Sequence, residues 1–241
     1  MTYCIGMLLK GGLVMLSDSR TNAGVDNIAT FRKMTVWEQP GERMIALLAA
    51  GNLAITQAVA THLEEGLGEP SEPIVAAPSM FRAAQLVGQA VRAVYTEVGG
   101  ALEAKDPNAF NVSFLLGGQI KDRRCRLFQI YSAGNFIHAS ERTPFLQIGE
   151  HKYGKPILDR ALAYETDLRV AAKLALLSMD STLRSNLSVG LPLDLLIYRT
   201  DQLKADLRRS IDEDDPYFRE IRQGWSSSLR NAIASLPDIP W

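Results

Sequence analysis

The chain has 241 residues, of which 46% are hydrophobic and 22% are charged. These fractions are typical of globular proteins, so they exclude disordered, collagenous and coiled-coil classes and favour one domain over residues 1–241. The 26 Lys and Arg against 27 Asp and Glu give a net charge of −1, which provides no general basic field. We therefore expect no nucleic-acid partner and no anionic membrane surface as a partner.

Compartment signals in the sequence favour the cytoplasm. Cys4 and Cys125 are the only cysteines, too few for a disulfide framework. No apolar run approaches the roughly 20 residues of a membrane span. The N-terminus lacks the basic and apolar pattern of a signal peptide. We expect a cytoplasmic protein without a membrane anchor.

The first fifty residues predict β structure. Apolar runs at residues 3–9 and 13–16 flank Lys10-Gly11-Gly12, which is a hairpin pattern. Two more strands are expected over residues 31–37 and 44–50, and the second is apolar on both faces, as in a buried sheet. A helix follows the turn at Gly51-Asn52, where the hydrophobic period changes.

The rest of the chain alternates between blocks of helices and blocks of strands. A second helix begins at Ser79, and four strands follow at residues 111–116, 126–131, 135–139 and 144–148. Two helices are then expected at residues 155–164 and 167–184, a strand at 194–199 and a tail helix at 216–235. This order indicates an α+β fold. The most economical form is a four-layer αββα sandwich of two antiparallel sheets flanked by helix pairs, with a C-terminal helical extension from about residue 211.

Several kinds of catalytic site find no support in the sequence. The three histidines, His62, His138 and His151, have no metal-ligand spacing, so we expect no metal. Phosphate-binding, dinucleotide-binding and nucleophile-elbow motifs are missing, so we also expect no cofactor and no α/β-hydrolase triad. We interpret the acidic run at residues 212–215 as a solvated helix start.

Thr2 is the remaining candidate for chemistry. A small residue after Met1 permits removal of the initiator methionine, which would leave Thr2 with a free α-amine. Such an amine, with a pKa of about 7.7–8.0, can act as the general base for the hydroxyl of the same residue. Because chains that begin Met-Thr are common, this hypothesis depends on its context.

That context is the spacing of polar residues after Thr2. Residues 17–24 read Ser-Asp-Ser-Arg-Thr-Asn-Ala-Gly, Lys33 interrupts an apolar strand, and Gly51 stands at a strand-to-helix turn. This arrangement resembles the N-terminal nucleophile hydrolases of the proteasome β type. The start Met-Thr-Tyr-Cys-Ile-Gly, residues 181–192 and the extension ending in Trp241 look most like Anbu, the bacterial ancestral beta subunit.

The resemblance implies a self-assembling threonine peptidase that cleaves peptide or amide bonds, in a homo-oligomeric ring or open spiral. Thr2 corresponds to the nucleophile, Lys33 to the lysine that assists its deprotonation and Asp18 to the partner of that lysine. Gly51 corresponds to the glycine whose N–H stabilises the oxyanion. The sequence does not identify an unfoldase partner.

Further positions match substrate-binding or orienting residues of the family. Arg20, Thr21, Asn22 and Leu53 correspond to the lining of the substrate site, where a peptide would add as a strand. Ser188 is a retained serine of the family.

The chain also departs from the family pattern. Ser185 stands where the family has aspartate, and Glu150 stands where a serine is expected. Asp180 is an alternative source of the missing carboxylate. The departures leave open a non-catalytic assembly subunit, and a small-amide amidase is a further alternative. Asp18 and Lys33 also fit a plain salt bridge, and the apolar tail fits packing within the chain or on a neighbouring subunit.

Overall fold

The computed structural model describes residues 1–22, 28–68, 71–104, 106 and 109–241. Its strands are β1 (Tyr3–Leu9), β2 (Gly12–Asp18), β3 (Arg20–Asn22), β4 (Ile28–Thr30), β5 (Met34–Gln39), β6 (Arg43–Gly51), β7 (Val112–Ile120), β8 (Arg126–Ile130), β9 (Phe136–His138), β10 (Phe145–Gly149), β11 (Leu193–Arg199) and β12 (Leu207–Ile211). Its α-helices are α1 (Leu53–Glu65), α2 (Met80–Val94), α3 (Gly100–Glu103), α4 (Lys155–Ala161), α5 (Leu168–Ser185) and α6 (Pro216–Ala234).

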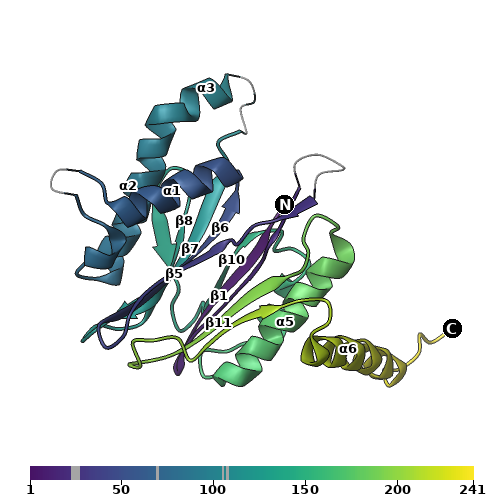
Figure 1. Ribbon diagram of the computed structural model, residues 1–241. Helices are drawn as coiled ribbons and strands as arrows, with labels where there is room; N and C mark the ends of the chain where they lie inside the picture. The colour runs from purple at the N-terminus through teal and green to yellow at the C-terminus, as the bar shows by residue number, and fades with distance from the viewer. Residues whose placement is uncertain (23–27, 69–70, 105, 107–108) are drawn as a thin grey trace.

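The strands form two five-stranded antiparallel sheets and one small hairpin. The first sheet has the order β10-β1-β2-β11-β12 and the second the order β5-β6-β7-β8-β9, while β3 pairs with β4. Helices α1 and α2 lie on one side of the sheets and α5 on the other (Figure 1). The α+β prediction is therefore confirmed.

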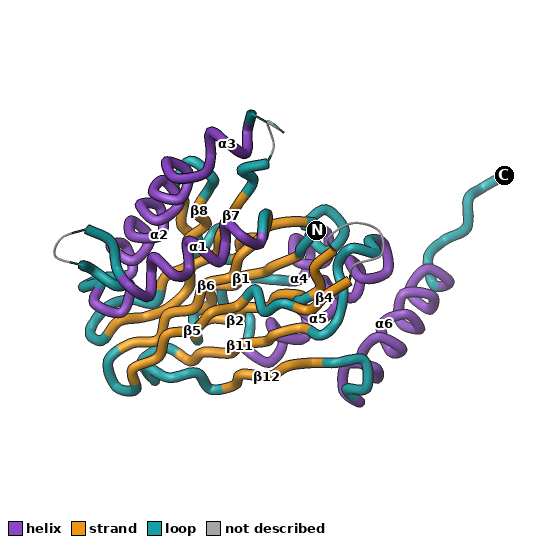
Figure 2. The backbone as a smooth tube through the Cα atoms, turned by 45° about the horizontal axis from the view of Figure 1, so that its top comes forward, coloured by secondary structure: helices purple, strands orange, loops and turns teal. Residues whose placement is uncertain are grey.

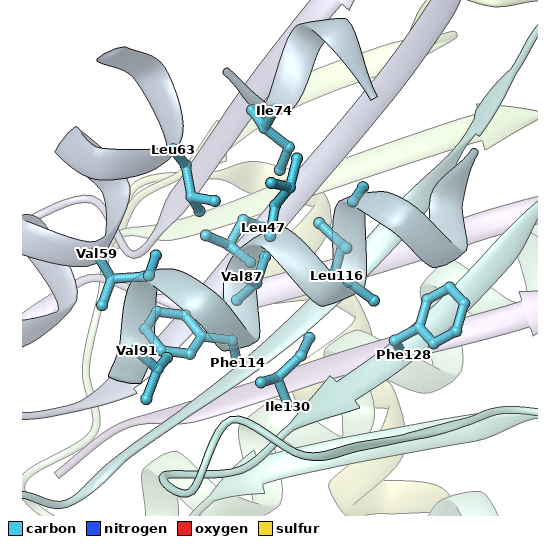
Figure 3. Packing of buried hydrophobic residues seen from close by; sticks show 14 of the residues in the cluster. Leu47, Val59, Leu63, Ile74, Val87, Val91, Phe114, Leu116, Phe128 and Ile130 are labelled. Carbon is cyan, nitrogen blue, oxygen red and sulfur yellow. The ribbon is translucent and has the colours of Figure 1, made fainter. Parts of the chain in front are cut away.

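Three clusters of buried apolar side chains hold these elements together. One lies between α1, α2 and the second sheet, and includes Leu47, Val59, Val87 and Phe114 (Figure 3). A second cluster joins α5 to the first sheet. The third fills the space between the two sheets and includes Met15 from the first sheet and Leu48 from the second. Burial of a side chain of this size contributes about 1.5–3 kcal/mol.

Polar caps fix where the long helices begin. The Asn52 side chain accepts from the N–H of Ala54 at 3.1 Å, and Ser79 accepts from the N–H of Arg82 at the start of α2. Such caps satisfy backbone donors that have no partner inside the helix. The cap at Asn52 starts α1 immediately after β6, so the last residue of that strand lies beside the first helical turn.

Two sequence expectations differ from the structure. Lys33 precedes β5 instead of lying within a strand, whereas Gly51 lies at the expected strand-to-helix turn, as the last residue of β6 before the Asn52 cap of α1. The edge strand β12 was not expected, because its pattern Leu-Arg-Arg-Ser-Ile buries only Ile211. The Gly24 of the expected family motif lies outside the described residues.

In the part of the chain that the structure describes, no helix has the length and hydropathy that crossing a bilayer requires. No group of three or more His, Cys, Asp or Glu among those residues is arranged to hold a metal ion.

Candidate functional site

Thr2 lies just before β1 and is held by the end of β10. Its carbonyl accepts a hydrogen bond from the N–H of Glu150 at 2.8 Å. Gly149 has φ +79°, and a Cβ there would lie 1.9 Å from the Thr2 carbonyl oxygen. A glycine is therefore required where β10 passes Thr2. Thr2 itself is 8% exposed, which leaves it nearly enclosed.

Asp18 ends β2 as a fully buried carboxylate with three hydrogen-bond donors. Lys33 Nζ donates to its Oδ1 at 2.7 Å and the N–H of Tyr3 to the same oxygen at 3.1 Å, while the N–H of Gly190 donates to Oδ2 at 3.3 Å. Burial raises the pKa of the Asp18 carboxyl above its usual range, and the charge of Lys33 and the three donors oppose that rise. Asp18 is thus hydrogen-bonded both to the backbone of Tyr3, the residue after Thr2, and to the side chain of Lys33.

Lys33 is buried together with this carboxylate. Its ammonium group also donates to the backbone carbonyl of Arg20 at 2.7 Å, and its side chain is 5% exposed. A buried ammonium without such partners would lose several kcal/mol of solvation. The two hydrogen bonds fix Nζ between the end of β2 and the start of β3.

Gly51, at the end of β6, lies in the same cavity wall as Thr2 and Lys33. It has φ +114°, and a Cβ would lie 1.9 Å from the Asn111 carbonyl oxygen. The next residue, Asn52, donates its N–H to that carbonyl at 3.0 Å. The backbone of β6 therefore approaches residue 111 too closely for any side chain at position 51.

These residues line one open cavity. Its walls are formed by Thr2, Thr21, Arg32, Lys33, Thr35, Leu47, Ala49, Ala50, Gly51, Leu53, Thr56, Gln57 and Ala60. A second open cavity on Thr2 is lined by Met1, Ala50, Gly51, Asn111, Ser113, Gly149 and Glu150. The structure thus brings together the predicted residues Thr2, Lys33, Gly51, Thr21 and Leu53, with Asp18 directly behind Lys33.

Other predicted residues have different surroundings. The Arg20 side chain donates to the carbonyl of Leu187 at 3.1 Å, so only its backbone meets Lys33. Asn22 pairs with Ile28 in the β3–β4 hairpin, and its side chain lies outside the described part of the structure. Ser188 lies in the turn between α5 and β11, where its N–H donates to Asn186 Oδ1 at 2.9 Å.

Asp180 does not take the place of the missing family carboxylate beside Thr2. Its Oδ1 accepts from Arg222 of α6 at 2.5 Å and its Oδ2 from Arg184 at 3.1 Å. The carboxylate is 1% exposed; its Oδ1 attaches α6 to α5, and its Oδ2 is bound within α5 itself.

Some residues of the site were not predicted from the sequence. Gly149 and Gly190 reach Thr2 and Asp18 from distant elements, and their only sequence signal is a glycine after a strand or in a loop. Arg32, Thr35 and Gln57 complete the cavity wall. Arg32 is the residue before Lys33 in the sequence, and the family pattern assigns a role only to Lys33.

Searches with models of protein families and with curated proteins find no match to this chain. Solved structures do match over the whole length. A Gly-1 mutant of Anbu from Hyphomicrobium sp. strain MC1 is 51% identical with a TM-score of 0.92, and each chain is covered completely. Anbu (ancestral beta-subunit) from Yersinia bercovieri is 49% identical with a TM-score of 0.92, covering 100% of this chain and 99% of that chain.

A third structure, described as the helical assembly of the Anbu complex from Pseudomonas aeruginosa, is 46% identical with a TM-score of 0.93. The match covers 99% of this chain and 98% of that chain. The sequence identity and the shared fold therefore extend over essentially the whole of this chain. The chain belongs to the Anbu, or ancestral beta-subunit, family.

Proposed function

We propose that this protein is a self-assembling, proteasome-like threonine peptidase of the cytoplasm that cleaves peptide or amide bonds without a cofactor. In this proposal the fold is the four-layer αββα sandwich of N-terminal nucleophile hydrolases. The chain is then a single proteasome β-like domain with a helical extension from about residue 211. The observation that carries the proposal is that Thr2, Lys33 and Gly51 line one cavity, with Lys33 bonded to the buried Asp18.

The mechanism assigns one task to each of these groups. Removal of Met1 frees the α-amine of Thr2, which accepts the proton of the Thr2 hydroxyl as the oxygen attacks the carbonyl carbon. The ammonium of Lys33, which donates to Asp18, lowers the free energy of the developing alkoxide. The N–H of Gly51 donates to the oxyanion of the tetrahedral intermediate. Collapse of that intermediate expels the amine, which takes the proton from the Thr2 α-ammonium, and leaves an acyl-enzyme. The freed α-amine then accepts a proton from the water that attacks the ester, and hydrolysis returns the Thr2 hydroxyl.

Substrate binding follows from the elements around the cavity. An extended peptide adds beside β3 through main-chain hydrogen bonds, with Arg20, Thr21 and Asn22 on one side and Leu53 in the cavity wall. The proposal includes no nucleic-acid or membrane partner. The helical assembly recorded for the relative from Pseudomonas aeruginosa supports assembly of this chain into a homo-oligomeric ring or open spiral.

A non-catalytic assembly subunit is the second candidate. The departures from the family pattern at Glu150 and Ser185 favour it. Ser185, at the family's aspartate position, is exposed at the end of α5. In this candidate, Asp18 and Lys33 only stabilise the fold.

A peptide epoxyketone separates the two candidates, because stable adduct formation requires both the hydroxyl and the free α-amine of an N-terminal threonine. We expect intact mass to show loss of Met1 and one inhibitor per chain. Thr2→Ala is the matched control, since alanine also permits removal of Met1 but has no hydroxyl. Retention of Met1 in the purified protein, or equal labelling of Thr2→Ala, would contradict the proposed mechanism.

A further inference from the structure

The cavity beside Thr2 has an uneven distribution of charge. Two cationic residues, Arg32 and Lys33, contribute to its wall, and none of the thirteen lining residues is Asp or Glu. The neutral polar groups are hydroxyls and one amide, including those of Thr35 and Gln57. Among the described lining residues, a substrate side chain that enters this cavity therefore meets two cations and no carboxylate.

The two cations differ in what they already bind. Lys33 donates to Asp18 and to a carbonyl, so its charge is matched by a carboxylate at 2.7 Å. Arg32 lies exposed just before Lys33, and among the described residues it belongs to no ion pair of 4.0 Å or less. Arg32 is thus the cation of this wall that is available to a ligand.

A neighbouring cavity contains an acidic group that interacts with Arg32. That cavity opens between the edge strands of the two sheets and is lined by Arg32, Met34, Asp194, Leu195, Arg208, Arg209 and Ser210. Arg32 and Arg208 both act electrostatically on Asp194, whose buried Oδ2 has no hydrogen-bond partner among the described residues. Asp194 therefore attracts Arg32 without holding it in a hydrogen bond.

The remaining wall suits a side chain with a short apolar stem and a polar end. Leu47, Ala49 and Leu53 provide apolar residues in the same wall as Thr2, and Thr35 and Gln57 add neutral polar residues to the wall that contains Arg32. An arginine binds a carboxylate with a planar pair of donors, which a neutral amide cannot match in strength.

Resting on the peptidase function proposed above, we infer that this cavity selects a glutamate or aspartate side chain at the residue on the acyl side of the cleaved bond. Arg32 is the specificity-determining residue, and Asp194 is a competitor for it. A charge-assisted hydrogen bond in a partly enclosed site makes an acidic side chain preferred over its amide by about 10-fold or more.

The test uses peptide epoxyketones that differ only in the residue next to the reactive group, which is Glu, Gln, Leu or Lys. The measured quantity is the second-order rate constant for adduct formation on Thr2, followed by intact mass. We expect the Glu probe to react at least about 10-fold faster than the Gln probe, and the ratio to fall as salt is added. Arg32→Gln should bring the ratio close to one, and Arg32→Glu should make the Lys probe the fastest.

Two further variants distinguish Arg32 from a general positive field. Arg208→Gln removes a cation that lines the neighbouring cavity and not the Thr2 cavity. Because Asp194 then attracts Arg32 alone, the Glu to Gln ratio should fall slightly, but far less than in Arg32→Gln. Asp194→Asn removes the competitor and should raise that ratio. Unfolding transitions of each variant show whether the fold is kept, which we expect for Arg32 because its side chain is exposed.

Each result has one meaning. Equal rates for the Glu and Gln probes on the unmodified protein would overturn the acidic preference and leave the threonine mechanism in place. A preference that survives in Arg32→Gln would overturn the role of Arg32. The lack of an adduct with any of the four probes would overturn both the peptidase function and the inference that rests on it.

Discussion

At the scale of single residues, Lys33 is the most informative position. Lys33→Ala should slow acylation of Thr2 by about two to four orders of magnitude, the range for a positioned electrostatic or acid–base group. It also leaves Asp18 buried without its ion-pair partner, which we expect to lower the free energy of unfolding by about 3–5 kcal/mol. Epoxyketone labelling rates and denaturant unfolding measure the two effects separately.

The double variant Asp18→Asn with Lys33→Met is the control for that prediction. It removes both charges of the pair and keeps similar volumes, so much of the lost stability should return while acylation stays slow. Acylation of the double variant at the unmodified rate would show that Lys33 is only structural, and the plain salt-bridge interpretation would then hold.

Cys125 gives a prediction about pH. Burial raises the pKa of its thiol from 9.0 to about 12. At pH 9 a thiol with the ordinary value is half ionised, whereas Cys125 should be only about 0.1% thiolate. In a Cys4→Ala background, alkylation by iodoacetamide should therefore be several hundred-fold slower in the folded protein than in denaturant, and should still rise between pH 9 and pH 11. A rate that levels off near pH 9 would contradict the raised pKa.

At the scale of elements, most strands and helices could be predicted from hydrophobic period and turn residues. The edge strand β12 could not, because Leu207–Ile211 exposes all but its last residue and is held by backbone pairing with β11. Lys33 was expected inside a strand because most residues of the segment 31–37 are apolar, yet β5 begins only at Met34. The Lys33 carbonyl still accepts from the N–H of Ala49 in β6 at 3.0 Å, so the residue lies at the very edge of the strand.

The residues of the candidate site could be predicted only near the N-terminus, where they follow the spacing of the family. Thr2, Asp18, Lys33 and Gly51 follow one another along the first 51 residues and match the spacing of the family. The contributions of Gly149 and Gly190 depend on how β10 and the loop before β11 pack against β1 and β2. Such long-range contacts leave no periodic signal in the sequence.

Helix α6 is attached to the body mainly through its first half. Phe218 is buried, and Arg222 donates to Asp180 at 2.5 Å. Arg222→Met removes a charge-assisted bond to a buried carboxylate and should lower the free energy of unfolding by about 1.5–3 kcal/mol. Amide hydrogen exchange in α6 should accelerate as well.

Arg230→Met is the matched control for Arg222→Met. It lies on the same helix, is exposed, and donates only to Ser227 at 3.3 Å. We expect it to change neither stability nor exchange measurably. Unaltered exchange of α6 in Arg222→Met would show that the pair with Asp180 does not hold the helix.

At the scale of the whole molecule, the tail extends away from the sheets and ends far from the other elements (Figure 2). Its side chains Ile233, Leu236, Ile239 and Trp241 are 67–104% exposed. Apolar groups exposed in a row mark contact surfaces. Of the two interpretations of the tail, the structure therefore favours contact with a neighbouring subunit over packing within the chain.

We expect the purified protein to be a homo-oligomer many times the mass of one chain, measured by light scattering. A closed or helical assembly of identical subunits requires one surface to meet a different surface of the next copy. The relative from Pseudomonas aeruginosa, described as a helical assembly, supports this expectation. A monomer at micromolar concentration would contradict it.

Deletion of residues 225–241 tests the contribution of the tail to that assembly. Burial of each large apolar side chain on a neighbour contributes about 1.5–3 kcal/mol, so the loss of several should shift the scattering mass to smaller species. The body should still unfold cooperatively, because Phe218 and Arg222 remain to attach the first half of α6. Ile137→Ser, which changes an exposed apolar residue outside the tail, is the control and should leave the mass unchanged. An assembly that keeps its size after the deletion would place the contacts on the sheets and helices of the body instead.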